Sequence, residues 1–180
     1  MTTDRYCRRW LLGAAAVTAA GLAGCGTVLG DGSPTQTPPH YENLETTAIY
    51  VSPQLDLELP TRLADVAVSN PYNAELILLP ADQNVGAEQV ADWLADAKLV
   101  GLLGSEAQDT WRDWVESDGV DDHFDTRGVA TSSPKPDLIV GYATGLTIAT
   151  SRFTWAAQHN VRDVLQGLDE AVADAEEAAN

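Results

Sequence analysis

Cysteine is nearly absent from this sequence, and its two occurrences lie close to the N-terminus. Cys7 and Cys25 both precede residue 40, and no cysteine follows them. Disulfide bonds, cysteine-rich zinc sites and a cysteine nucleophile are therefore excluded from the rest of the chain.

Basic residues are also scarce. The 180 residues include ten lysines and arginines against 27 aspartates and glutamates, a formal net charge of −17, and just two of the ten are lysines, Lys98 and Lys135. No basic patch is present to neutralise phosphates, so nucleic acid is the least expected partner. With 44% hydrophobic residues the chain still has enough apolar material for a core, and its length suits one domain.

The N-terminus departs from this acidic pattern. Arg5, Arg8 and Arg9 precede an uncharged, mostly apolar run from Trp10 to Gly24. This run is shorter than the roughly 20 residues that a permanent membrane-spanning helix needs, and it ends in small residues. We interpret residues 1–24 as a signal peptide, with an uncleaved membrane anchor as the alternative.

Two short motifs in this region resemble known export signals. Arg8-Arg9-Trp10-Leu11-Leu12 resembles the twin-arginine signal, in which two arginines precede one residue of any type and two large apolar residues. Leu22-Ala23-Gly24-Cys25 resembles a lipobox, in which cleavage before the cysteine is coupled to lipid attachment on its sulfur. The resemblance implies that Cys25 carries a lipid, that residues 25–40 form a flexible tether, and that the protein is anchored on the outer face of the cell membrane.

The acidic composition in turn resembles that of proteins from salt-loving archaea, in which dense surface carboxylates keep the protein hydrated. Near 1 M salt the Debye length is about 3 Å, so repulsion between the carboxylates is strongly screened. Together these resemblances imply a haloarchaeal-type lipoprotein exported by the twin-arginine route and adapted to high salt.

Strand-like and helix-like segments alternate after Tyr41. Expected strands, including continuous apolar runs typical of buried parallel strands, lie at 46–52, 74–79, 98–104, 137–143 and 146–150, the last two as a hairpin. Expected helices are a short one after Pro60, 86–97, one opened by a Ser105 and Gln108 capping box, and one capped by Asn160 and Asp163 that ends near residue 178. We predict one α/β domain over 41–180, a three-layer sandwich with a mostly parallel, flavodoxin- or Rossmann-like sheet of four to five strands.

The stretch from Glu75 to Trp114 resembles glutamine-amidotransferase-like α/β domains, with a strand ending in Leu-Leu-Pro, a helix, and then Gly-Leu-Leu-Gly-Ser opening another helix. Domains of that family carry a nucleophilic cysteine in the turn after a strand. Because this stretch has no cysteine, the resemblance implies the fold and not the activity.

Polar residues at the carboxyl ends of the expected strands are the candidate ligand-binding group, because ligands of open parallel sheets bind there. They are Asp82, Gln83, Asn84, Ser105 and Tyr142. The alternative is that they are turn and cap residues. Glu106, in the first turn of the next helix, would repel an anion, and no phosphate-binding loop is present, so we expect no nucleotide and no other cofactor.

Five carboxylates and His123 occur between Glu116 and Asp125, a composition that suits Ca²⁺. The spacing does not match an EF-hand loop, so we interpret the cluster as a solvated acidic surface and predict no metal site. The surrounding loop, 117–136, is unusually long and suits a lid or a partner surface. Its cations Arg127 and Lys135 could pair with nearby carboxylates instead of a ligand.

Three function hypotheses follow. The first is a non-catalytic, membrane-tethered domain that binds a small molecule or an envelope protein. The second is a small extracytoplasmic hydrolase that uses carboxylates or Ser105 at the strand ends, with His123 or His159 as a base. The third is a structural component of the envelope, which would expose an apolar patch.

Overall fold

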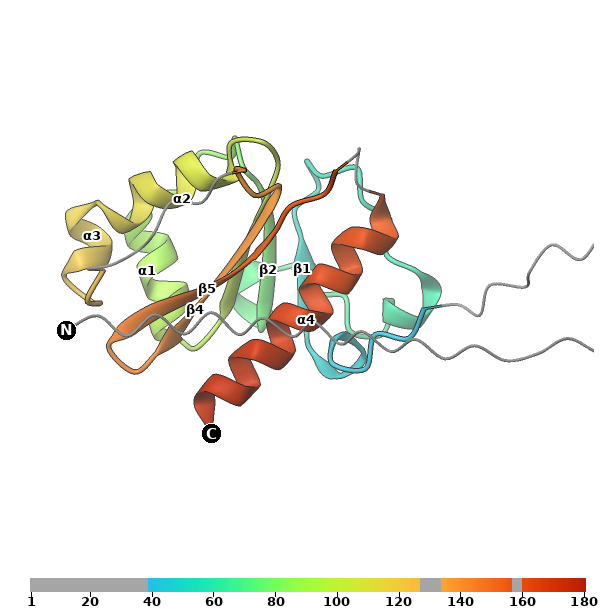
Figure 1. The fold of residues 1–180 in the computed structure, drawn as a ribbon. Helices are drawn as coiled ribbons and strands as arrows, with labels where there is room; N and C mark the ends of the chain where they lie inside the picture. Colours follow the sequence, from blue (N-terminus) through green and yellow to red (C-terminus); the bar gives the residue numbers. More distant parts are fainter. Residues whose placement is uncertain (1–38, 127–133, 157–159) are drawn as a thin grey trace, which may run out of the picture. The chain divides into compact units, whose positions relative to one another are not determined.

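The computed structural model describes residues 39–126, 134–156 and 160–180, which form an α/β domain with an open, mixed sheet of five strands and four α-helices (Figure 1). The strands are β1 (Ile49–Val51), β2 (Leu76–Pro80), β3 (Leu99–Leu103), β4 (Leu138–Thr144) and β5 (Thr147–Phe153). The helices are α1 (Ala87–Ala95), α2 (Ala107–Val115), α3 (Asp118–Asp121) and α4 (Val161–Ala179), and 3₁₀ turns form η1 (Leu44–Thr46), η2 (Thr61–Leu63) and η3 (Pro71–Asn73).

The strands follow one another across the sheet in chain order, β1-β2-β3-β4-β5. β1, β2 and β3 are parallel, whereas β4 is antiparallel to β3 and β5 is antiparallel to β4. The prediction of a mostly parallel sheet is therefore right for the first three strands and wrong for the last two. The strand order also has no reversal of the kind that defines flavodoxin- and Rossmann-like sheets.

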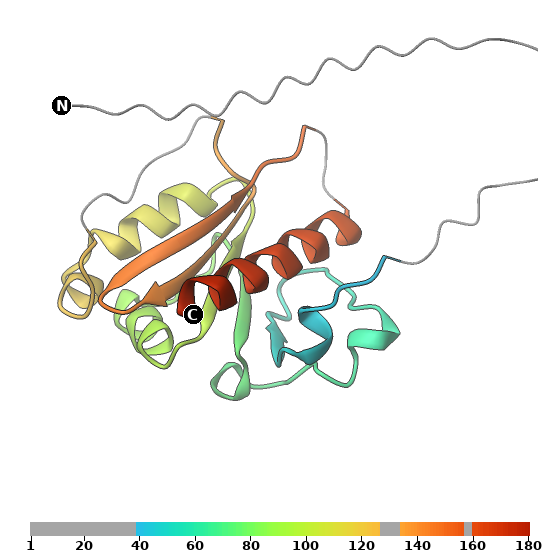
Figure 2. The same ribbon diagram turned by 60° about the horizontal axis from the view of Figure 1, so that its bottom comes forward.

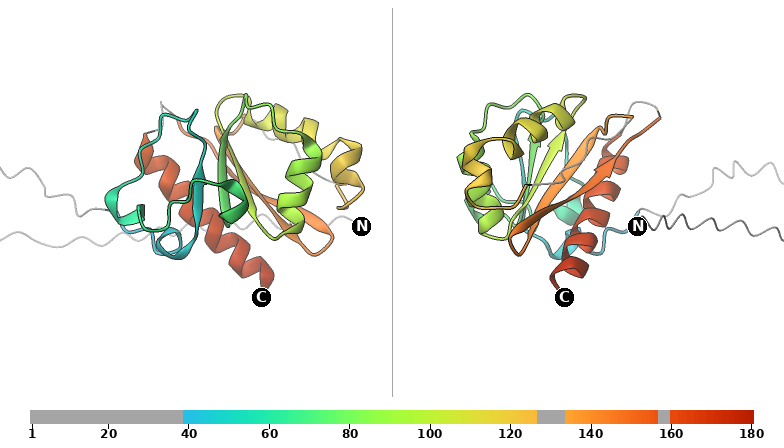
Figure 3. Two further views of the ribbon diagram at one scale, coloured as in Figure 1. Left: turned by 180° about the vertical axis from the view of Figure 1, so that it is seen from behind. Right: turned by 60° about the vertical axis from the view of Figure 1, so that its left-hand side comes forward.

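Helices cover both faces of the sheet, as the three-layer prediction requires. On one face, Ile77, Leu79 and Ile139 pack with α1 and α2, and Trp93, Trp111 and Trp114 are buried there. On the other face, Leu76 and Leu78 pack with α4 and with residues of η1 and η2. Figures 2 and 3 show α4 alone across one face and α1 and α2 on the other. Strands buried on both sides explain the continuous apolar runs in the sequence.

Element boundaries differ from the predicted ones mainly at turns. Pro80, expected to stop the second strand, is the last residue of β2 and is buried. The predicted hairpin is confirmed and longer than expected, with Gly145 at φ 65° in its turn, a conformation that glycine adopts without strain. The short helix after Pro60 is a single 3₁₀ turn, η2.

The reversed direction of β4 follows from where the chain goes after α2. Near the amino end of β3, Asp125 donates its backbone N–H to the Leu146 carbonyl in the β4–β5 turn at 2.7 Å. At the opposite end of the strands, the Gly104 N–H donates to the Asp137 carbonyl at 2.8 Å. The chain between Asp125 and Asp137 thus leads from one end of the strands to the other, and β4 starts where β3 ends. The predicted loop 117–136 contains α3, and its part from 127 to 133 lies outside the described residues.

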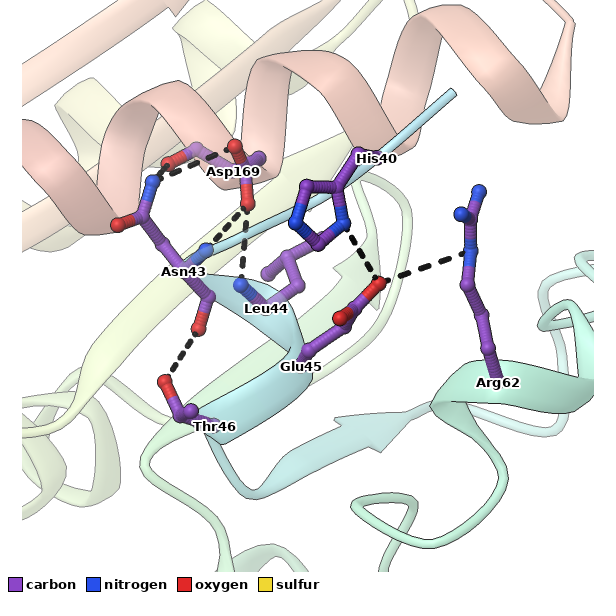
Figure 4. A network of polar contacts seen from close by, with 7 residues as sticks. All are labelled: His40, Asn43, Leu44, Glu45, Thr46, Arg62 and Asp169. Carbon is purple, nitrogen blue, oxygen red and sulfur yellow. Dashed lines mark hydrogen bonds and ion pairs between the residues drawn. The ribbon is translucent and has the colours of Figure 1, made fainter. Parts of the chain in front are cut away.

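The N-terminal end of the described domain is fastened to the middle of α4 (Figure 4). The Asp169 carboxylate accepts hydrogen bonds from the backbone N–H groups of Asn43 and Leu44, at 2.9 and 3.0 Å. The Asn43 side-chain amide donates to the Asp169 carbonyl at 3.2 Å and to its carboxylate at 3.3 Å. A carboxylate on the C-terminal helix therefore supplies the acceptors for backbone N–H groups at the start of η1, which would otherwise need solvent.

Trp111 fixes the position of α2 on the sheet. Its indole is 1% exposed and lies directly over Gly141 of β4, where an added Cβ would come within 2.0 Å of the ring. A side chain at position 141 and the indole cannot occupy this space together, so the close approach of α2 requires glycine there.

Replacement Gly141→Ala is therefore expected to lower the free energy of unfolding by about 1–3 kcal/mol, because the added methyl group overpacks the interface of α2 with the sheet. Urea denaturation at high salt measures the change. Gly86→Ala is the control, since a Cβ at Gly86 has nothing within 4 Å, and its cost should be about 1 kcal/mol or less. Equal effects of the two substitutions would contradict the packing argument.

Candidate functional site

The carboxyl ends of β1, β2 and β3 form the edge of the sheet at which the sequence predicts a ligand site. Backbone hydrogen bonds extend the ladder just past the strands: Ser52 donates to Leu78 at 2.9 Å, and Ala81 donates to Leu103 at 2.9 Å. The start of β4 joins the same edge through the bond from Gly104 to Asp137. The four chain segments are thus held in fixed order along what we call the carboxyl edge.

Gly104 makes the turn from β3 into α2. Its φ is 133°, which side chains rarely tolerate, and a Cβ on it would lie 3.3 Å from the Ala81 Cβ. The predicted capping box of Ser105 and Gln108 is wrong: Glu106 occupies the N-cap position, and no side chain there caps the helix. The reason is that the turn at Gly104 places the start of α2 one residue later than the motif assumes. Ser105 is exposed.

Two hollows open on either side of this turn. One, of about 400 Å³, is lined by Asp82, Ser105 and Glu106 together with Ala81, Leu103 and Gly104. The other, of about 450 Å³, lies toward α4 and is lined by Leu55, Asp56, Leu57, Leu103, Gly104, Asn160, Val161 and Val164. Because Leu103 and Gly104 line both, the two hollows meet at the end of β3.

Side chains of α2 hold the loop that follows β2. Thr110 donates its hydroxyl to the Ala81 carbonyl at 2.7 Å, and the Trp114 indole N–H donates to the Val85 carbonyl at 3.1 Å. The loop that carries Asp82 is therefore fixed at both ends by one helix. Such support keeps a site in one geometry before a ligand arrives.

The segment leading into β4 is also attached to α2. Lys135 lies 2.5 Å from the Asp109 carboxylate, and Arg112 lies 3.1 Å from it. The hydrogen bond from Lys135 lowers the pKa of the Asp109 carboxyl group, with Arg112 acting in the same direction. Pairing of Lys135 with a nearby carboxylate, one of the two predicted alternatives, is thus confirmed.

Both carboxylates and apolar side chains line the hollows at the carboxyl edge. Asp56, Asp82 and Glu106 line the hollows, and none of the three forms an ion pair with a described residue. Leu55, Leu57 and Leu103 supply apolar surface in the hollow that holds Asp56, and Ala81 and Leu103 supply it in the hollow that holds Asp82 and Glu106. This arrangement favours a cation or a hydrogen-bond donor with an apolar part, and it disfavours phosphate and other anions.

The structure brings together some of the predicted site residues and separates others. Asp82 and Ser105 face the same hollow. Gln83 and Asn84 follow Asp82 but do not line either hollow, and the Gln83 side-chain oxygen is buried without a hydrogen-bond partner among the described residues.

Placement of Tyr142 with this group is wrong. It lies at the opposite end of the strands, in a hollow of about 290 Å³ beside Glu75, Leu99 and Val172. The physical reason is the antiparallel direction of β4, whose carboxyl end points away from those of β2 and β3.

The acidic cluster from Glu116 to Asp125 begins at the C-cap of α2 and continues through α3 and the turn after it. Asp121 accepts a hydrogen bond from the Thr126 hydroxyl at 2.9 Å, and His123 contacts the Gly119 carbonyl at 3.2 Å. Within residues 39–126, 134–156 and 160–180, no three histidine, cysteine, aspartate or glutamate side chains are grouped in a way that could hold a metal ion.

Several predicted features lie outside the described residues: Arg8, Arg9, Cys25, the signal segment 1–24, most of the tether, Arg127 and His159. In the described part of the chain, no helix combines the length and the apolar composition needed to cross a membrane.

Sequence reasoning missed the α4 side of the carboxyl edge. Leu55, Asp56 and Leu57 belong to a segment with alternating apolar and polar residues that has no regular secondary structure. The sequence predicts Asn160 as a helix cap, which is confirmed, but gives no sign that it lines a hollow. The alternation of Leu55, Leu57 and Leu59 is the signal that could have indicated a segment packed against the core.

The different roles of two predicted caps give a direct test. Ser105→Ala should change the free energy of unfolding by less than about 0.5 kcal/mol, because Ser105 is exposed and caps no helix. Asn160→Ala should cost about 1 kcal/mol, because the Asn160 side chain accepts from the Asp163 N–H at 3.1 Å in a reciprocal capping box. Chemical denaturation of both variants measures the difference, and a larger loss for Ser105→Ala would contradict the observed start of α2.

Comparisons with protein families, with curated proteins and with solved structures found no match to this chain.

Proposed function

We propose that this protein is a lipid-anchored extracytoplasmic protein, adapted to high salt, whose α/β domain binds a small molecule or an envelope protein at the carboxyl edge without catalysing a reaction. The anchoring rests on the twin-arginine and lipobox motifs that end at Cys25. The binding role rests on one observation: two hollows meet at Gly104, and both carboxylates and apolar side chains line them.

The chemistry of the hollows supports a ligand class. Three carboxylates without ion-pair partners among the described residues favour an amine, a guanidinium group or a neutral donor over an anion. Leucine side chains beside them favour a ligand with an apolar part. In concentrated salt, long-range attraction is screened, so hydrogen bonds and apolar contact at close range must supply the affinity.

The hydrolase alternative has one supporting observation, because Ser105, Asp82 and Glu106 line one hollow. A serine nucleophile needs a base within hydrogen-bond reach. His40 contacts Glu45 at 3.1 Å, and His123 lies beside Leu146 at the opposite edge of the sheet. Neither described histidine is therefore at Ser105, so His123, one of the two bases that the hydrolase hypothesis names, does not serve Ser105.

The structural-component hypothesis requires an exposed apolar patch. In the described part of the chain, the large hydrophobic side chains that are exposed are Tyr72, Leu146 and Val161, one each on η3, the hairpin turn and α4. Single exposed side chains on separate elements do not form a patch.

Anchoring is tested by mass spectrometry of the protein from fractionated cells. Wild type is expected in the membrane fraction, with the mass of residues 25–180 plus a lipid, and Cys25→Ala should lose the lipid. Cys7→Ala is the matched control, since Cys7 lies in the segment that is removed. A wild-type chain that is full length, unacylated and cytosolic would contradict the proposal.

Binding is tested by capturing ligands and partners from membranes at native salt. Asp82→Asn combined with Glu106→Gln should reduce capture by about tenfold, the loss expected when charge-assisted hydrogen bonds are removed. The control pair Asp92→Asn and Glu170→Gln makes the same charge change at exposed positions on α1 and α4. Equal loss in both pairs would contradict a site at the carboxyl edge, and ester hydrolysis abolished by Ser105→Ala would favour the hydrolase.

A further inference from the structure

The hollow of about 290 Å³ that Tyr142 lines, at the end of the strands opposite the carboxyl edge, has no part in the proposed function. We call it the Tyr142 hollow. Its other lining residues lie at the amino ends of β2 and β3, beside η1 and in the last turns of α4. In Figure 1 this end of α4, marked C, lies at the bottom of the view, as does the β4–β5 turn. The volume is near the lower end of the roughly 300–1,000 Å³ of small-molecule sites, so the hollow suits a small ligand.

Two carboxylates line the Tyr142 hollow, those of Glu75 and Glu176. The Oε2 atom of Glu75 accepts a hydrogen bond from the Ala48 N–H at 2.8 Å, which fixes the carboxylate and leaves Oε1 without a partner among the described residues. Glu176 is exposed, and its side chain forms no hydrogen bond or ion pair with a described residue. The hollow therefore presents acceptors that are still available to a ligand.

No basic residue neutralises these carboxylates, because no lysine, arginine or histidine is among the described residues that line the hollow. Lys98 is adjacent in sequence to two of them, but its Nζ donates to the carbonyls of Tyr72 and Ala74, at 3.0 and 2.9 Å. Thr46 and Thr47, which also line the hollow, donate their hydroxyls to the carbonyl at the N-cap of η1, at 3.1 and 2.7 Å. The hollow is thus negatively charged, and the donors around it already have acceptors.

Apolar and aromatic groups supply the remaining surface. Leu99 packs with the core on the α4 face of the sheet, and Val172 and Ala175 line the hollow from α4. Tyr142 is half-buried and makes no hydrogen bond or ring contact with a described residue. An aromatic ring attracts a cation through its negative face, and aliphatic side chains favour contact with hydrocarbon.

We propose that the Tyr142 hollow binds a small organic ammonium ion, a primary amine in its charged form with a short hydrocarbon part. Charge complementarity and the mixed lining select this class. The carboxylates of Glu75 and Glu176 can accept from the ammonium N–H groups, while Leu99 contacts the hydrocarbon. A divalent metal ion fits less well, because Ca²⁺ takes about six to eight oxygen ligands and gains nothing from an apolar wall. The proposal is independent of the carboxyl edge.

The test is NMR titration of the isotope-labelled full chain in neutral detergent, with n-butylammonium chloride in phosphate buffer and about 2 M NaCl. We expect saturable shifts of the backbone amides of Ala97, Leu99, Tyr142 and Ala175, and none at Gly104. Two reduced probes separate the contacts: 1-butanol lacks the charge, and ammonium chloride lacks the hydrocarbon. Each should bind about fivefold or more weakly than n-butylammonium, because each keeps only one kind of contact.

Matched variants near the end of α4 test the carboxylates. Glu176→Gln should weaken n-butylammonium binding about fivefold or more, because it removes a charged acceptor. Glu177→Gln is the control: it makes the same charge change at the next exposed residue, which is not among the described residues that line the hollow, and should weaken binding less than about twofold. Glu75→Gln should act like Glu176→Gln and keep the fold, since its amide oxygen can still accept from the Ala48 N–H.

Equal weakening by Glu176→Gln and Glu177→Gln would overturn the proposal, because the amine would then respond only to the general acidity of the surface. Shifts that do not saturate, or that spread over the whole domain, would also overturn it. So would binding of 1-butanol or of the ammonium ion that is as tight as that of n-butylammonium, because the hollow would then not select the combination of charge and hydrocarbon.

Discussion

Reversal of the chain between β3 and β4 determines most of what this domain presents to solvent. Because β4 starts beside the end of β3, the carboxyl edge has three parallel strands and the entry to a fourth, joined by the bond between Gly104 and Asp137. The same reversal turns β4 and β5 into a tight hairpin and leaves β5 as the outer strand. The hollows at Gly104 and the position of β5 as the last strand of the described sheet are thus two results of one change in direction.

Much of the local structure could be predicted from the sequence, and the direction of β4 could not. Apolar runs mark strands that are buried on both faces, and the reciprocal cap of Asn160 and Asp163 marks the start of α4. Neither pattern specifies whether a strand is parallel to its neighbour. That information lies in tertiary contacts on either side of the connection from Asp125 to Asp137, where Asp125 bonds to Leu146 and Asp137 bonds to Gly104 and Phe153. The predicted group therefore places Tyr142 at the wrong end of the strands, whereas Asp82 and Ser105 do line one hollow.

The acidic side chains have different surroundings in different parts of the domain. On α3, Asp121 accepts a hydrogen bond from Thr126 of the same segment, and the carboxylates form no metal-binding group among the described residues. At the carboxyl edge, carboxylates adjoin leucine side chains in a hollow, which gives them a geometry suited to selecting a ligand. Along the β4–β5 hairpin acids are missing altogether. The acidic residues are therefore informative where they line a hollow, and the hairpin is informative because it has none.

The attachment of Asn43 and Leu44 to Asp169 has a mechanical consequence. Tension applied through the residues before Pro39 enters the domain at η1 and is carried by four hydrogen bonds to the middle of α4. α4 passes that load onward through its packing and through Asp174, which accepts a hydrogen bond from Ser151 of β5 at 2.6 Å. A pulling force therefore spreads along the longest helix and across the sheet instead of peeling β1 from its edge.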